Sequence, residues 1–199
     1  MIFRNITTDK QTTYRLESNE KIVFFMLNRS GAITFELAGK GAEAHIFSFF
    51  IGRKDDKGTL AITQRHSAPQ TTSHALAKSV LFDASEYIYE GLIAIGKQAD
   101  WSDASQESRA LLCSPLTQAS SQPSLEILAN DVKCRHAATA SPLNQESLFF
   151  AESRGLSSSQ AEHLLIQGFI DEAVEKIKKL GVDTSLIVKS LEMKMKNFI

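Results

Sequence analysis

The chain has 199 residues, with 22 basic and 23 acidic side chains and a formal net charge of −1. This near balance argues against a dedicated nucleic-acid binder, since such proteins usually present a basic face. No apolar run approaches the roughly 18 residues that a membrane-spanning helix needs, so no membrane partner is expected. The polar N-terminus lacks a signal-peptide core, and the two cysteines, Cys113 and Cys134, make no disulfide framework. We therefore expect a cytoplasmic protein with both thiols reduced.

From about Lys21 to His136 the sequence predicts a succession of short strands separated by Gly, Asp, Ser and Asn. The apolar run from Ile46 to Ile51 is typical of a buried strand. Most of the other runs cover only three to six residues. Breaks are expected at glycines and prolines, among them Gly58, Gly91 and Pro123. Such a pattern suits a sandwich, a barrel or a solenoid. Because few connections look like two-residue hairpin turns, the solenoid is favoured, although no clean repeat period is visible.

After Ser141-Pro142 the pattern becomes helical. One short helix is expected around residues 148–150, with Gly155 as its C-terminal cap. A second is expected to open with a capping box from Ser159 to Glu162 and to end at Gly181. A third is predicted over residues 184–199. These patterns predict a β core over residues 1–140 and a C-terminal helical region over residues 141–199, with the second helix packed on the strands.

The most informative motif is the run from Asp131 to His136, which places a thiol and an imidazole two residues apart on a predicted strand. Side chains at i and i+2 of a strand share a face, so Cys134 and His136 should point the same way. They offer one soft and one borderline ligand to iron, zinc or copper. Two ligands do not close a metal site, so further donors are expected from elsewhere, most plausibly a partner chain. The competing interpretation is a buried thiol beside a hydrogen-bonded histidine.

The other candidate residues carry weaker signals. His66 and His74 bracket a strand-like run and share strand parity. A solenoid could place both on one face, but structural or solvent-facing roles are expected. The sequence contains no nucleophile elbow, no H-E-x-x-H run and no phosphate-binding P-loop. We therefore predict that the chain is not an enzyme in its own right, and that any ATP hydrolysis comes from a partner.

Several separated motifs, in order, resemble the SufB/SufD family of iron-sulfur cluster assembly proteins. They are Pro123 to Ile127, Asp131 to His136, Ser153 to Gly155 and, upstream, His66 to Ser73. The likeness spans about Gly41 to Leu180.

The resemblance implies a mainly β protein, a right-handed parallel β-helix followed by a small C-terminal helical region. It also implies a scaffold in a SufBCD-type complex, paired with a SufB-like β-helix paralogue and recruiting a SufC-like ATPase through the C-terminal helices. The Cys-x-His pattern is similar to the D-type paralogue, because B-type members carry a His-Glu pair near that place. The resemblance then implies that His136 lies at the interface between the paralogues, where a nascent cluster or iron binds transiently. Cys134 is implied there as the second residue. No tightly bound cofactor is expected in the isolated chain, and a homodimer is an alternative pairing.

Three departures from the family pattern matter. Strand-like sequence begins by about Lys21, so the N-terminal helical domain of usual members is expected to be absent. Ala137 replaces a glycine of the D-type pattern, which affects the local turn. Cys113 lies one residue out of register with the B-type cysteine, so no cluster role is transferred to it.

Two rival functions follow from these observations. One is a shortened structural or interaction paralogue that keeps the pairing surface without metal chemistry. The other is a carbohydrate-active β-helix enzyme, which usually needs catalytic carboxylates gathered on one face.

Overall fold

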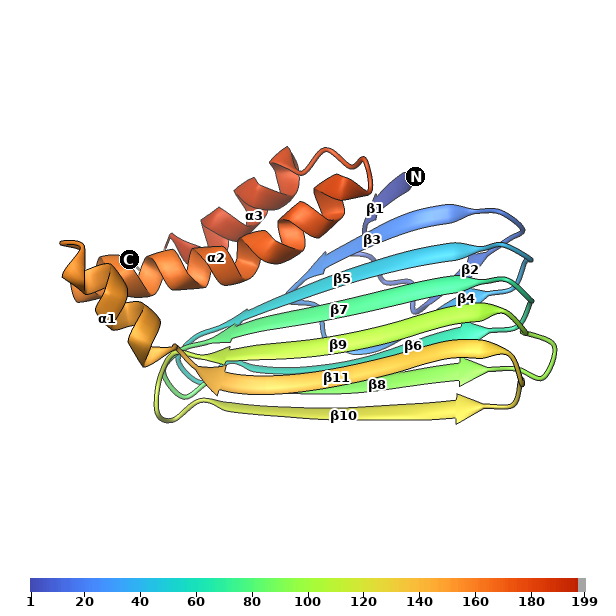
Figure 1. Cartoon of the computed structure of the whole chain (residues 1–199), viewed down its shortest axis with the longest axis horizontal. Coiled ribbons are helices and arrows are strands. Elements are labelled where there is room, and N and C mark those ends of the chain that lie inside the picture. The colour runs from blue at the N-terminus through green and yellow to red at the C-terminus, as the bar shows by residue number, and fades with distance from the viewer. Residues whose placement is uncertain (197–199) are drawn as a thin grey trace.

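The computed structural model describes residues 1–196. Within them, the strands form two parallel sheets that face each other as a flattened solenoid (Figure 1). The first sheet, called sheet A, runs in the order β1-β3-β5-β7-β9-β11, and sheet B runs β10-β8-β6-β4-β2. Successive strands of the chain alternate between the sheets, as a coil does on each turn. The parallel β-helix expected from the sequence is confirmed.

The strands are β1 (Ile2–Asn5), β2 (Thr13–Leu16), β3 (Lys21–Leu27), β4 (Gly31–Leu37), β5 (Glu43–Gly52), β6 (Lys57–His66), β7 (Thr72–Leu81), β8 (Glu86–Ile95), β9 (Ser102–Leu112), β10 (Gln118–Ile127) and β11 (Val132–Pro142). Most are longer than predicted, and Gly58, Gly91 and Pro123 lie inside strands instead of between them. The breaks expected at these three residues were wrong. Glycine is needed inside the strand at Gly58 and Gly91, because a side chain there would collide with Phe50 and Gln106, respectively.

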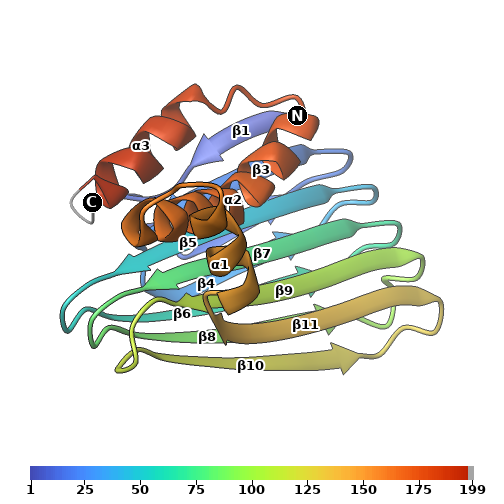
Figure 2. The same cartoon turned by 60° about the vertical axis from the view of Figure 1, so that its left-hand side comes forward.

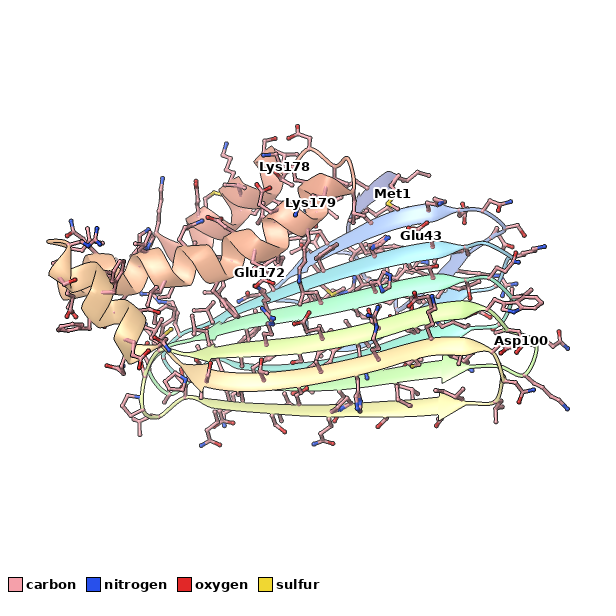
Figure 3. The ribbon with its side chains drawn as sticks, viewed as in Figure 1. Met1, Glu43, Asp100, Glu172, Lys178 and Lys179 are labelled. Carbon is pink, nitrogen blue, oxygen red and sulfur yellow. The ribbon has the colours of Figure 1, made fainter. Side chains whose placement is uncertain are left out.

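A ladder of left-handed residues forms one corner of the solenoid. Asn19, Gly41, Gln70 and Trp101 have φ values of 61°, 72°, 59° and 60°. Each donates its backbone N–H to a carbonyl in the next coil, as Gln70 does to Asp100. Asp100 marks this corner in Figure 3. Because four different residue types adopt this conformation, the structural repeat has no matching repeat in the sequence.

The C-terminal helices are α1 (Gln145–Ser153), α2 (Ser158–Lys179) and α3 (Ser185–Met195), and Figure 2 shows them over the outer face of sheet A. None of the helices within residues 1–196 is long and apolar enough to cross a membrane. The predicted C-caps are confirmed, since Gly155 and Gly181 have φ values of 92° and 80°. The predicted capping box was two residues out of place. Ser157, not Ser159, caps α2, because its hydroxyl accepts from the Gln160 N–H and the Gln160 side chain accepts from the Ser157 N–H.

The packing of α2 explains why β5 reads as an almost continuous apolar run. Strands buried on both faces lose the alternation of a half-exposed strand. Ile46 points into the solenoid core, whereas Phe47 and Phe49 pack outward in a cluster with Ile170 of α2.

An ionic contact also ties α2 to sheet A. Lys78 of β7 has a side chain only 1% exposed, and its Nζ lies 2.8 Å from Glu172 Oε2. Arg109 of β9 reaches the same carboxylate oxygen at 2.7 Å. Figure 3 shows Glu172 on the face of α2 that meets the sheet. A buried ammonium needs such a partner, so these contacts fix α2 on the solenoid.

Candidate functional site

Cys134 and His136 lie in β11, the last strand of sheet A and therefore an edge of the sheet. The register pairs Cys134 with Ala104 and His136 with Gln106 of β9. Ala104 and Gln106 are buried in the space between the sheets, so both candidate ligands belong to the inward-facing row of the end coil. The structure thus brings the two residues onto one face. Whether they bind a metal stays a prediction.

The two residues differ in their surroundings. Cys134 is half-buried and packs against a small apolar cluster that contains Ile93, Ile95 and Ala104. Burial raises the pKa of the Cys134 thiol above its ordinary value, and the nearby Asp103 carboxylate raises it further. His136 is exposed, because no later coil covers β11. Cys134 is therefore a protonated thiol until a cation displaces its proton, whereas His136 is open to solvent.

The donor set within the chain is incomplete. Among residues 1–196, no group of three or more His, Cys, Asp or Glu side chains is arranged to hold a metal ion. A site built on Cys134 and His136 would need donors from another molecule, because transition metals in proteins usually take four or more. Both residues lie where a second molecule could approach, at an open sheet edge.

Cys113 follows β9 and lies on the other side of sheet A from Cys134. It packs at the margin of the apolar cluster between sheet A and the helices. Burial, with a smaller contribution from Glu162, raises the pKa of the Cys113 thiol to about 12. It is consequently a poor nucleophile and a poor ligand at neutral pH.

His66 and His74 do not share a face, and the structural role expected in place of a shared site is found for His66. His66 lies in sheet B and is buried in the interior, where its ring nitrogens hydrogen-bond with the hydroxyls of Thr71 and Ser73, both at 2.7 Å. His74 lies in sheet A on the outward face, with its Nδ1 2.7 Å from Ser105 Oγ. Equal parity in the sequence does not give a shared face here, because a corner of the coil lies between the two strands. At that corner the chain passes from sheet B to sheet A, and the row changes from inward-facing to outward-facing.

Sequence reasoning also missed a polar row on the outer face of sheet A. The rings of His45 and His74 lie 5.3 Å apart, and His45 Nε2 is 2.8 Å from Glu43 Oε1. Lys21 Nζ approaches the other Glu43 oxygen at 2.7 Å. Burial, together with the neighbouring His45, lowers the pKa of His74. The Glu43–His45 spacing was the available signal, but the contact between the histidines depends on the solenoid register.

Taken together, the fold and the site define a parallel β-solenoid scaffold with a Cys-x-His pair at its open end coil. The family model described as the SufBD core domain of the SUF system for iron-sulfur cluster assembly matches residues 15–169. The chain therefore belongs to the SufB/SufD family.

Individual relatives agree with this assignment. SufD of Escherichia coli is 27% identical over 154 residues, covering 77% of this chain and 36% of the relative. SufB of Bacillus subtilis is 25% identical over 154 residues, with shares of 77% and 33%. A SufBD family protein of Synechocystis is 32% identical over 123 residues, with shares of 62% and 26%. The chain thus spans between about a quarter and about a third of the length of these relatives, and its identity to SufD and to SufB is almost equal.

Proposed function

We propose that this chain is a D-type scaffold component of a cytoplasmic iron-sulfur cluster assembly complex, in which it pairs with a B-type β-helix paralogue. The observation that carries the proposal is the position of Cys134 and His136, which share the inward row of a coil whose sheet edges are both unpaired. Such a pair supplies half of a ligand set exactly where another chain can supply the rest. Membership in a family of iron-sulfur cluster assembly proteins supports the substrate class of this proposal, iron or a nascent iron-sulfur cluster.

The two side chains have different roles in this proposal. The exposed His136 imidazole makes the first contact with incoming iron, because it is open to solvent. The Cys134 thiol follows, and it must release a proton when the metal binds, since burial and Asp103 keep its pKa high. Capture by Cys134 is therefore favoured by rising pH, and the isolated chain holds iron only weakly.

In this proposal the helical region docks the ATPase subunit. Phe149 and Phe150 of α1 are 72% and 59% exposed, and Leu164 of α2 is 53% exposed. Large apolar side chains gathered at one end of the molecule often mark a protein interface. We assign this surface, Phe149, Phe150 and Leu164, to the ATPase.

The test is anaerobic co-purification of the chain with a B-type paralogue and the ATPase, followed by iron and sulfide analysis. His136→Ala is expected to lower the cluster content several-fold without changing complex formation, and Cys134→Ala to lower it less. His163→Ala, on α2, is the matched histidine control. Unchanged cluster content in the His136→Ala complex would contradict the metal role and favour the structural paralogue, and self-association without a B-type chain would favour the homodimer.

A further inference from the structure

A strip of polar side chains inside the solenoid has buried atoms without a hydrogen-bond partner among residues 1–196. These atoms are both polar amide atoms of Gln64, the hydroxyl of Tyr89, Gln106 Oε1 and Ser121 Oγ. Gln64, Tyr89 and Gln106 are each at most 2% exposed, so bulk solvent does not reach them. Leaving a buried donor or acceptor unpaired is costly, and such groups in native proteins are nearly always bonded to protein or to ordered water. The strip therefore needs a bound partner.

The four side chains of this interior polar strip, Gln64, Tyr89, Gln106 and Ser121, come from four strands but lie together. A Cβ placed on Gly91 would lie 2.1 Å from Gln106 Oε1 and 2.9 Å from Tyr89 Cε1, so the amide and the ring meet over this glycine. Ser121 is the partner of Tyr89 in the ladder of sheet B. Gln64, on the neighbouring strand β6, lies diagonally across the ladder from Gly91. The unpaired atoms therefore share one region of the core.

The strip adjoins a cavity of about 180 Å³ at the end coils, which Ser121 lines together with Ser108, two residues from Gln106 on the inward face of β9. The other lining residues are a tyrosine, a serine, a threonine and four alanines, so no wall of the cavity carries a charge. A charged ligand would lose its hydration here without gaining an opposite charge. A neutral molecule that both donates and accepts hydrogen bonds fits, and the cavity has room for several water molecules.

We propose that the interior polar strip and the adjoining cavity bind a row of ordered water molecules. Water suits the atoms on offer: Gln64 both donates and accepts, whereas Gln106 accepts through Oε1 because its Nε2 already donates to the Gly91 carbonyl at 3.2 Å. Burial raises the pKa of Tyr89, so its hydroxyl stays protonated and can donate. Gln106 is the partner of His136 in the ladder of sheet A, so the waters reach the candidate site from inside the solenoid. This inference does not rest on the proposed function.

A high-resolution crystal structure of the wild-type protein tests the proposal directly. We expect water molecules within hydrogen-bond distance of Gln64, Tyr89 and Gln106, and further water molecules in the cavity beside Ser121. A second crystal is measured under xenon pressure, because xenon binds in dry apolar cavities. Xenon in the strip, or a strip without water, overturns the proposal.

Two substitutions test the same inference in solution. Tyr89→Phe and Gln64→Met remove the polar atoms and keep the shape of the side chain, so each should lower the folding equilibrium constant in urea unfolding about three- to tenfold if water is bound. Tyr14→Phe is the matched control, because the Tyr14 hydroxyl is also buried but bonds with Asp9 at 2.8 Å and Arg29 at 3.0 Å. Unchanged or increased stability in the two strip variants, beside a loss in the control, means that no water pairs these atoms and overturns the proposal. If a strip variant does not fold, the wild-type crystal structures decide.

Discussion

His66 is a structural histidine in a protein whose proposed function rests on a different histidine, His136. Its ring is buried and hydrogen-bonds with Thr71 and Ser73, and Thr71 in turn bonds with Ser102 of the next coil at 2.8 Å. Burial, aided by the positive charge that His74 can carry, lowers the pKa of His66 to about 4. The sequence favoured a structural role for His66 over a metal-binding one, and the structure supplies the physical basis of that role, burial and two hydrogen bonds.

The low pKa of His66 makes stability depend on pH in a defined window. The folded pKa of about 4 lies below the value of 6.5 for a free histidine, so unfolding takes up a proton. The stabilisation is complete above about pH 6.5 and is lost as pH falls toward 4, with a total of about 3 kcal/mol. We expect His66→Gln to flatten this part of the pH dependence in urea unfolding at pH 7 and pH 4.5. A wild type and a variant with equal slopes would show that His66 is charged in the folded protein.

At the scale of the element, β8 shows why strand boundaries were misjudged. Residues 87–89 and 92–95 have the pattern of two short strands, but both belong to the single strand β8, with Gly91 between them. A Cβ at Gly91 would lie 2.1 Å from Gln106 Oε1, whose amide nitrogen donates to the Gly91 carbonyl at 3.2 Å. The glycine therefore makes room for a side chain of the opposite sheet and does not mark a turn. No local pattern carries that information.

Two glycine substitutions compare Gly91, which makes room for a neighbouring side chain, with Gly168, which has no such neighbour. Gly91→Ala is expected to lower the free energy of unfolding by about 1–3 kcal/mol, because Gln106 has to move within a packed interior. Gly168→Ala in α2 meets no atom within 4 Å and is expected to raise it by about 0.5–1 kcal/mol, since alanine favours a helix. Urea unfolding measures both. A neutral Gly91→Ala would mean that Gln106 is free to move aside.

For the whole molecule, α2 buries one face against sheet A and leaves the other face exposed. Ile170 is 1% exposed in the cluster that joins the helices to sheet A, whereas Leu164, on the same helix, is 53% exposed. The amphipathic pattern predicted a helix packed on the strands, and that prediction is confirmed. Which strands it covers depends on the order β3-β5-β7 in sheet A, which brings together residues far apart in the chain.

Aspartate substitutions test this division. Ile170→Asp buries a charge and is expected to destabilise the protein by more than about 3 kcal/mol, with increased binding of an apolar dye. Leu164→Asp should change the free energy of unfolding by less than about 0.5 kcal/mol but weaken binding of the ATPase. Urea unfolding and a pull-down with the ATPase measure the two effects. Retained ATPase binding in a folded Leu164→Asp variant would show that the ATPase docks on another surface.

Local periodicity predicted the strands, the following helices and the shared face of Cys134 and His136, and the separated family motifs predicted the parallel β-helix. The structure alone placed both residues at an unpaired edge, separated His66 from His74 and joined His74 to His45. These relations depend on which residues stack from coil to coil. One corner of the coil has a left-handed conformation that Asn, Gly, Gln and Trp all adopt, so no common residue type marks the repeat in the sequence.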